Sequence, residues 1–244
     1  MNQPDYMMVL SAVMHQFRAS TKNIAYHANE LSVATRGEID VANVQYRTQQ
    51  IIEAVPVISS QLALVDLYLA PQQLGQVDEI SLHNLFFKTI QHLRLKQKEK
   101  KVQIILSGDG RFNIHANNIV ENIPYILFDN AIKYSPPSMN VDVLIYEDMV
   151  TDSILVCVSS MGPKLGEGES PSVTKLNFRG TYARATMLPG QGIGLFILDS
   201  ICKNQGIQLS ISSEGGESII NEIPYRLFKV KMCFRSASQS LISR

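Results

Sequence analysis

The chain has 244 residues, enough for one large domain or two small ones around a well-buried core. Its 22 Lys and Arg residues balance 22 Asp and Glu residues, so the formal net charge is zero, and only 18% of the residues are charged. General binders of nucleic acid or of anionic membranes carry a basic excess, so this balance argues against both kinds of partner.

Nothing in the sequence predicts a membrane segment. The longest unbroken apolar stretches, such as residues 154–158, are far shorter than the ~20 residues that a membrane helix requires. The N-terminal region carries Asp5 where a signal peptide has a basic start. We therefore expect a soluble, cytoplasmic protein.

Residues 1–75 are predicted to form a helical hairpin. Apolar side chains recur at helical spacing over residues 10–31, and a polar joint follows around Gly37. Over residues 51–69 the apolar steps alternate between four and three, the heptad spacing that packs one helix against others. A hairpin cannot bury such a seam alone, so either the next domain covers it or a second copy of the chain does. We favour a homodimer with a four-helix bundle.

From residue 76 to residue 244, helical and strand patterns are mixed. Helices are predicted at residues 82–95, 117–134 and 192–204, and strands at residues 102–106, 141–146, 154–159, 207–213 and 226–234. Strands and helices do not alternate strictly, so an α+β fold with helices layered on one sheet fits better than a doubly wound fold.

A long segment of the second domain lacks apolar periodicity. Between Gly162 and Gly190 lie 27 residues that are rich in glycine and proline. A compact domain rarely carries a loop of this length unless the loop is a lid or a binding loop. We interpret it as a lid, and surface disorder is the alternative.

A GxGxG run follows the predicted lid. It comprises Gly190, Gly192 and Gly194, and Leu195 continues into the last predicted helix. Glycines let the backbone approach a ligand closely, and the N–H groups at a helix N-terminus favour a phosphate. The run lacks the third glycine and the preceding strand of the dinucleotide fingerprint. A turn that serves only helix packing is the alternative.

Four segments of the second domain together resemble one family, in their order and spacing. They are DNAIKYSP at residues 129–136, SSMGP at 159–163, NFRG at 177–180 and GQGIGL at 190–195. The chain resembles the ATP-binding domain of the histidine kinase, gyrase, Hsp90 and MutL superfamily, in its histidine-kinase branch. The resemblance covers about residues 78–236 and implies a helix-on-sheet sandwich that binds Mg-ATP under the lid.

The resemblance also implies roles for individual residues. Asn130 would ligate Mg²⁺, Lys133 would face the phosphates and Tyr134 would flank the nucleoside. From the lid, Arg179 would reach the terminal phosphate. The other positions expected to bind the cofactor are Ser160, Gly162, Gly190, Gly192, Gly194 and Leu195. For Lys133 and Arg179 the alternative is a solvated surface charge, and for Tyr134 it is simple packing at a helix end.

The first predicted helix carries a candidate phosphoacceptor. The segment HQFRAS at residues 15–20 resembles the phosphoacceptor box of dimeric histidine kinases. His15 lies nearly opposite the apolar stripe of its helix, and hence in solvent, where a phosphorylated imidazole must be. A neutral imidazole nitrogen is a usable nucleophile near pH 7. His27 lies closer to the stripe and is predicted to be structural, and an ordinary exposed histidine is the alternative for His15.

Three positions depart from the family pattern. Ser160 stands where the family has the Asp that binds the adenine amino group, and Lys164 replaces the second glycine of that segment. One helical turn before Asn130, Ile126 stands where the superfamily has a Glu or Asn. A Ser hydroxyl can still accept a hydrogen bond, but replacing a charge-assisted bond with a neutral one costs on the order of 1 kcal/mol.

Two functions therefore stand against each other. The first is a homodimeric histidine kinase that uses Mg-ATP to phosphorylate His15, for transfer to a response-regulator partner. The second is a degenerate kinase that acts as a phosphotransfer, docking or regulatory module, for example on a partner kinase. An ATPase of the gyrase or chaperone type is least favoured, because Ile126 takes the position of its general base.

Overall fold

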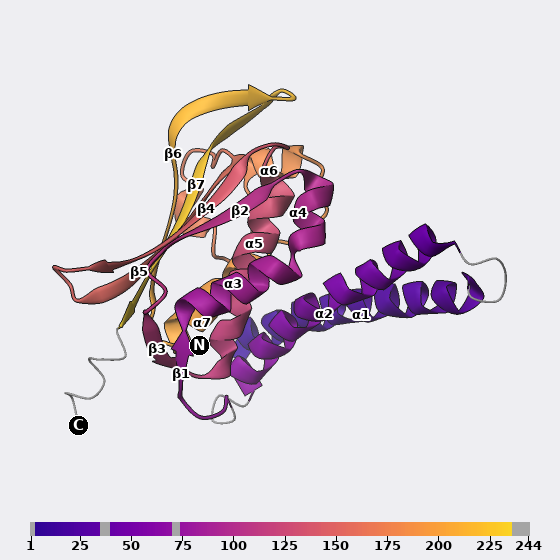
Figure 1. The fold of residues 1–244 in the computed structure, drawn as a ribbon, viewed down its shortest axis with the longest axis horizontal. Helices are drawn as coiled ribbons and strands as arrows, with labels where there is room; N and C mark the ends of the chain where they lie inside the picture. The colour runs from indigo at the N-terminus through magenta and orange to yellow at the C-terminus, as the bar shows by residue number, and fades with distance from the viewer. Residues whose placement is uncertain (1–2, 35–39, 70–73, 236–244) are drawn as a thin grey trace. The chain divides into compact units, whose positions relative to one another are not determined.

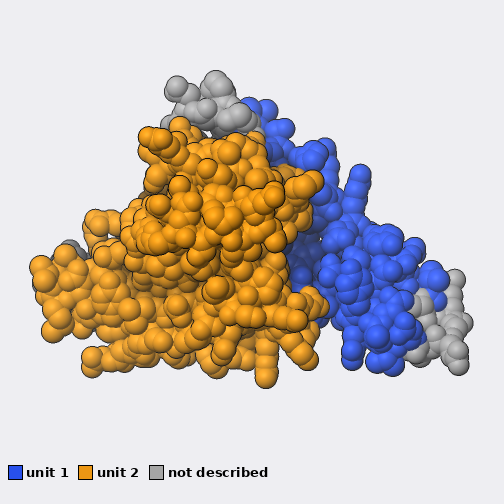
Figure 2. Space-filling view, turned by 90° about the horizontal axis from the view of Figure 1, so that it is seen from above, with its two compact units in different colours: residues 1–74 blue, residues 75–244 orange. Residues whose placement is uncertain are grey.

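The computed structural model describes residues 3–34, 40–69 and 74–235. The chain divides into two compact units, residues 1–74 and residues 75–244, which Figure 2 shows in different colours. The division falls one residue from the boundary expected from the sequence.

The first unit is a hairpin of two long helices, α1 (Gln3–Ala34) and α2 (Val41–Leu69). The joint predicted around Gly37 lies outside the described residues. Asp40 starts α2, because its Oδ1 accepts hydrogen bonds from the backbone N–H groups of Ala42 (3.0 Å) and Asn43 (3.2 Å). These N–H groups have no partner inside the helix, so the carboxylate acts as its N-cap.

Arg47 of α2 connects the two helices of the hairpin. Its guanidinium lies 3.3 Å from His27 Nδ1 and forms an ion pair of 3.2 Å with Glu30. It also lies over the rings of Tyr26 and Tyr46, at 5.3 Å and 5.8 Å from their centroids. His27 is 6% exposed, so the prediction that it is a structural residue is confirmed.

The apolar seam of α2 is largely open in a single chain. Val55, Leu62 and Leu69 expose 51%, 46% and 51% of their surface. By length and composition α2 could also cross a membrane, with a mean hydropathy of 1.5 over its most apolar window. The expectation that no segment is apolar enough is therefore wrong. Small and amide residues interrupt the apolar residues of α2, so the helix contains no long unbroken apolar run. This length and this mean hydropathy also occur in helices of soluble helix bundles.

The second unit is built on a mixed five-stranded sheet. Its strand order is β2-β4-β5-β7-β6, with β2 and β4 parallel and all other neighbours antiparallel. The strands are β2 (Gln103–Gly108), β4 (Asn140–Asp148), β5 (Ser153–Pro163), β6 (Gln208–Ile220) and β7 (Ile223–Arg235). A separate antiparallel pair is formed by β1 (Asp78–Ser81) and β3 (Asn113–Ala116).

The helices of this unit cover one side of the sheet, as Figure 1 shows for α3, α5 and α7. Their bounds are α3 (Leu82–His92), α4 (Arg94–Lys100), α5 (Asn122–Tyr134), α6 (Thr181–Ala185) and α7 (Gly194–Asn204), with 3-10 turns at Asn118–Glu121 and Ser170–Ser172. The predicted α+β fold, a helical hairpin followed by a helix-on-sheet sandwich, is confirmed.

The core of the second unit lies between α5 and the central strand β5. The first four residues of β5 are all buried, and from Val156 to Gly162 every second residue is buried, as the two-residue period of a strand predicts. On the helix side, Phe128 of α5 is fully buried and meets the fully buried Phe86 of α3 edge to face, with ring centroids 5.7 Å apart. This packing fixes the position of α5, whose last turns carry the predicted site residues.

Several elements differ from the sequence prediction. The helix predicted over residues 82–95 is two helices, because the backbone leaves the helical conformation at Leu93 (φ −89°, ψ 9°). The strand predicted to end at residue 159 continues through the SSMGP segment to Pro163. The short strands β1 and β3 were not predicted, since four residues are too few to show a period.

Replacing Phe128 with Ala tests this core. We expect Phe128→Ala to lower the free energy of unfolding by about 3–5 kcal/mol, because it removes a fully buried ring and leaves a cavity. Urea unfolding followed by circular dichroism measures the loss. The matched control is Phe87→Ala, whose ring is 48% exposed and should cost far less. Equal losses in the two variants would contradict this packing.

Candidate functional site

The last turns of α5 carry polar side chains on a helix that is otherwise buried. Asn130, Lys133 and Tyr134 are each half-exposed and follow one another at helical spacing. The neighbouring Asp129 is engaged elsewhere, because Lys96 Nζ donates to its Oδ1 at 2.5 Å. Within the described residues the side chain of Asn130 has no hydrogen-bond partner. Its amide is thus available to a ligand.

The glycine run lies against the same face of α5. A Cβ added to Gly194 would be 3.7 Å from Ile126 Cγ2, and one added to Gly190 would overlap Lys133 Nζ. Ile126 and Lys133 lie on either side of Asn130 along the helix face. The fold therefore brings together the DNAIKYSP and GQGIGL segments, which are far apart in the sequence.

Gly192 holds the lid against the glycine run. Its φ of +72° lies in the left-handed region, and an added Cβ would overlap the carbonyl oxygen of Phe178. Glycine is required here for two reasons. Any other residue would strain the backbone at this positive φ, and its side chain would displace the lid.

The glycine run leads directly into the N-terminus of α7. Ile193 is the N-cap and makes no side-chain cap. The first hydrogen bond of the helix, from Ile197 N to Ile193 O, leaves the N–H groups of Gly194, Leu195 and Phe196 without a partner inside the helix. Such N–H groups favour an anion, as does the positive end of the helix dipole.

Two cations converge on Gly190. Lys133 Nζ lies 4.9 Å from the centroid of the Tyr134 ring. Arg179 Nη1 donates to Gly190 O (3.1 Å), and its Nη2 donates to Tyr134 Oη (3.4 Å). Neither Lys133 nor Arg179 takes part in an ion pair with any described residue. Their positive charge is therefore uncompensated beside the glycine run.

Arg179 also closes the last part of the lid. Its Nη2 donates to the carbonyl oxygens of Ala183 (2.8 Å) and Leu188 (2.9 Å), so the guanidinium holds the chain around α6. Arg179 is thus not a freely solvated surface charge. To contact a phosphate it would have to exchange some of these bonds for bonds to the ligand.

Glu169 forms a second crosslink within the lid. Its Oε2 accepts a hydrogen bond from Gly166 N (2.7 Å), and its Oε1 accepts from the N–H (2.8 Å) and hydroxyl (2.7 Å) of Thr181. Partial burial acts to raise the pKa of Glu169, but the bonds from Thr181 and Gly166 outweigh it and hold this pKa below its ordinary value of 4.5. The lid is therefore an ordered segment, and surface disorder does not describe it.

The SSMGP segment lies in a strand. Ser160 is buried in β5 between Val141 of β4 and Phe228 of β7, and Gly162 packs on Phe228. Beyond the strand, Lys164 Nζ donates to Glu217 at 2.8 Å. The side chain that replaces the second family glycine is thus engaged with the β6–β7 hairpin.

One further polar group near the site was missed by the sequence analysis. Ser135 follows Tyr134 directly and is 1% exposed, and its Oγ has no hydrogen-bond partner among the described residues. A buried hydroxyl without a partner is costly, which makes Ser135 a candidate for contact with a ligand. The sequence did not single out Ser135, because a serine after a helix is also typical of an ordinary turn.

The donors at this site fit a polyphosphate better than they fit a cation. The glycine run, the N-terminus of α7, Lys133 and Arg179 all present positive charge or N–H groups. Among the residues expected from the sequence to bind the cofactor, Asn130 alone carries a side-chain carbonyl oxygen. The described residues contain no cluster of three or more His, Cys, Asp or Glu side chains that could hold an ion. A Mg²⁺ ion would therefore depend largely on phosphate and water oxygens.

Comparison with known proteins agrees with this geometry. Residues 115–227 match the family described as histidine kinase-, DNA gyrase B- and HSP90-like ATPase. The relatives in sequence include the histidine protein kinase SaeS of Staphylococcus aureus, 24% identical over 144 residues. The match covers 59% of this chain and 40% of SaeS, so the chain spans well under half the length of these curated relatives.

Solved structures of histidine kinases share the fold. AdeS of Acinetobacter baumannii aligns with a TM-score of 0.53 at 15% identity, covering 90% of this chain and 98% of that chain. Full-length ShkA, solved in complex with AMPPNP, aligns with a TM-score of 0.58 at 14% identity, covering 93% of this chain and 45% of that chain. The mycobacterial sensor histidine kinase MprB aligns with a TM-score of 0.51 at 17% identity, covering 66% of this chain and 99% of that chain.

Replacing Gly192 with Ala tests the contact between the lid and the glycine run. We expect Gly192→Ala to destabilise the second unit by about 1–3 kcal/mol, because the new methyl group meets the Phe178 carbonyl and the backbone has a positive φ. The control is Gly216→Ala, where an added Cβ has no neighbour within 4 Å. Thermal unfolding of both variants measures the difference. A loss no greater in Gly192→Ala than in the control would contradict the contact.

Replacing Glu169 with Gln tests the second crosslink and its pH dependence. Because its pKa is lowered, Glu169 stabilises the lid above its ordinary pKa and loses this effect as the pH falls through the lowered value. At pH 7 we expect Glu169→Gln to speed hydrogen exchange at the Gly166 and Thr181 amides by about tenfold. The difference in exchange rate from wild type should disappear once the pH falls below this lowered pKa. The exposed Glu167→Gln is the control, and a gap that persists in acid would refute the assignment.

Proposed function

We propose that the chain is a histidine-kinase-type signalling protein, because residues 115–227 match the family of histidine kinase-, DNA gyrase B- and HSP90-like ATPases. It binds Mg-ATP in its second unit and phosphorylates His15 of its first unit, or passes phosphate through it. A response regulator with an acceptor Asp is the proposed partner.

The observation that carries this proposal is the convergence of two cations on Gly190. Lys133 and Arg179 have no carboxylate partner among the described residues, and both lie next to Gly190, in the glycine run that leads into α7. A triphosphate would supply the missing negative charge. Lys133 would face the phosphates from α5, and Arg179 would hold the lid over them. Asn130 would offer its amide oxygen to the Mg²⁺ ion that the phosphates bring.

His15 is the proposed acceptor. Its side chain is exposed on α1, as a nucleophile that must meet a nucleotide requires. An imidazole nitrogen of His15 would form the N–P bond while the bond from the terminal phosphorus to the ADP oxygen breaks. The nitrogen must be unprotonated to attack, so neutral pH favours the step.

We also propose that the hairpin forms a homodimer. Val55, Leu62 and Leu69 lie on the heptad seam of α2, and each exposes about half of its surface in one chain. A second hairpin would cover these side chains in a four-helix bundle. Burial of the seam in this way would also explain the hydropathy of α2 without a membrane, in keeping with the predicted cytoplasmic location.

A second candidate function is a degenerate kinase that acts as a phosphotransfer, docking or regulatory module. It is favoured by the three departures from the family pattern. Ser160 is a buried neutral residue, the Lys164 ammonium is paired with Glu217, and Ile126 presents only apolar atoms to Gly194. Weak or absent nucleotide binding would follow from this candidate.

Calorimetry with Mg-ATP separates the two candidates. We expect the full chain to bind Mg-ATP, and Lys133→Gln to weaken binding about tenfold because it removes a charge-assisted bond to phosphate. The matched control is Lys231→Gln, an exposed lysine on β7. Absence of binding by the wild-type chain would favour the degenerate module. Equal affinity of wild type and Lys133→Gln would remove Lys133 from the site.

Labelling tests the phosphoacceptor. Incubation with ATP labelled on its terminal phosphate should give an acid-labile label on the chain, since a phosphohistidine is hydrolysed in acid. We expect His15→Ala to abolish this label and His92→Ala, another exposed histidine, to retain it. A chain that binds Mg-ATP but takes up no label would argue against the kinase. A label that survives His15→Ala would place the acceptor elsewhere.

A further inference from the structure

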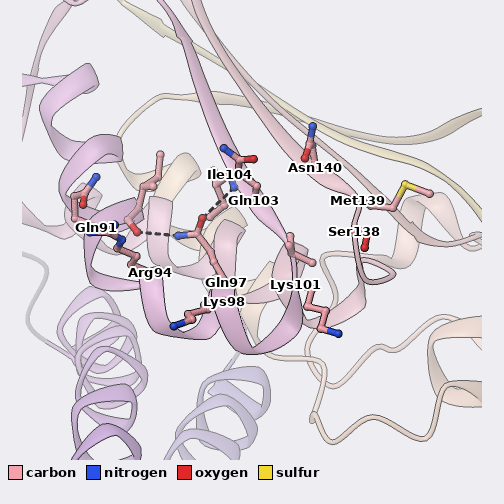
Figure 3. Close-up of a pocket in the computed structure, with 12 residues that line it drawn as sticks. Gln91, Arg94, Gln97, Lys98, Lys101, Gln103, Ile104, Ser138, Met139 and Asn140 are labelled. Carbon is pink, nitrogen blue, oxygen red and sulfur yellow. Dashed lines mark hydrogen bonds between the residues drawn. The ribbon is translucent and has the colours of Figure 1, made fainter.

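The second unit has a surface groove that shares no residue with the candidate nucleotide site. It has a volume of about 640 Å³ and is lined by the end of α3, by α4 and by the first residues of β2 and β4 (Figure 3).

The groove has a fixed floor. The Gln97 amide bridges it, because its Nε2 donates to Ile90 O (2.9 Å) and its Oε1 accepts from Ile104 N (3.0 Å), as Figure 3 shows. At one rim, Ser138 N donates to Lys101 O at 2.6 Å. The buried side chains of Val102 and Ile104 complete the base. This shape is therefore held by hydrogen bonds between elements.

The charge on the groove is of one sign. Arg94, Lys98 and Lys101 line it, and no Asp or Glu does. None of these three cations forms an ion pair with a described residue, whereas the nearby Lys96 is paired with Asp129. A chain with zero net charge thus carries three uncompensated positive charges on this groove. Charge complementarity calls for an acidic occupant.

The open rim favours a peptide over a small ligand. Eight of the twelve lining residues are exposed, whereas a site for a small molecule buries most of its ligand. No aromatic residue lines the groove, so it offers no surface on which nucleic-acid bases could stack. An extended peptide segment could contact the groove along the whole length of the groove.

The edge of the sheet offers a second means of recognition. β2 is the outermost strand beside β4, so its other edge has no strand neighbour among the described residues. Ile104 N–H points out of the sheet to Gln97, and Leu106, two residues on, has the same orientation. A strand edge of this kind can pair with an added extended segment.

We propose that the groove between α4 and the edge strand β2 docks an extended, acidic peptide segment of a partner protein. Carboxylates of the segment meet Arg94, Lys98 and Lys101, and its backbone pairs with the open edge of β2 near Leu106. This interaction does not involve the nucleotide site and does not depend on its activity.

Fluorescence anisotropy with the full chain tests the proposal. The probe is a labelled peptide of alternating Glu and Thr, compared with one of alternating Gln and Thr. We expect the Glu peptide to bind and the combined variant Arg94→Gln, Lys98→Gln and Lys101→Gln to bind it at least about tenfold more weakly. A matched triple variant at the exposed Lys22, Lys175 and Lys231 should bind like wild type.

Hydrogen exchange supplies an independent measurement on the unaltered chain. Saturation with the Glu peptide should slow exchange at the Leu106 amide, because strand addition gives it a partner. The proposal would be overturned if the wild-type chain did not bind the Glu peptide. It would also be overturned if the wild-type chain bound the Gln peptide equally well, or if the triple groove variant bound the Glu peptide as tightly as wild type. If the wild-type chain bound a single-stranded oligonucleotide or anionic vesicles more tightly than the Glu peptide, and the triple groove variant lost that binding, the groove would have a different ligand and the peptide proposal would be wrong.

Discussion

The site depends on one packing contact, that of the glycine run on the polar face of α5. Gly194 lies near Ile126 and Gly190 lies near Lys133, so two segments far apart in the chain come together. At Gly190 an added Cβ would displace the Lys133 ammonium. The buried pair of Phe86 and Phe128 holds α5 in place, and the lid is held in turn by Gly192. Backbone N–H groups and cations converge as a result of this packing.

The departures from the family pattern acquire a physical meaning in this structure. Ile126 stands where the family has a polar residue, and its side chain lies next to Gly194, so it supports the glycine run. Lys164 forms an ion pair with Glu217, and Ser160 lies inside a paired strand. Such a pattern is compatible with nucleotide binding at reduced affinity, which is why binding and phosphate transfer must be measured separately.

The sequence predicted what depends on short-range periodicity and on glycine chemistry. The hairpin and the central strands were predicted from periodicity and are observed. The resemblance to a family, rather than periodicity, implied that the glycine run lies near Asn130, and the structure places the run next to α5. The break at Leu93, the extension of β5 to Pro163 and the small sheet of β1 and β3 were not, because tertiary pairing decides them. The bonds of Arg179 to carbonyls of its own lid were also missed, since its resemblance to a family position indicates no partner. No motif marked the groove beside α4, whose cations come together only in three dimensions.

The proposed nucleotide site can be tested by a crystal structure of the chain with a non-hydrolysable ATP analogue and Mg²⁺. We expect phosphate oxygens within hydrogen-bond distance of the N–H groups at the start of α7 and of Lys133 Nζ, with Asn130 facing the metal. A nucleotide bound elsewhere on the second unit, or phosphates turned away from the glycine run, would contradict it.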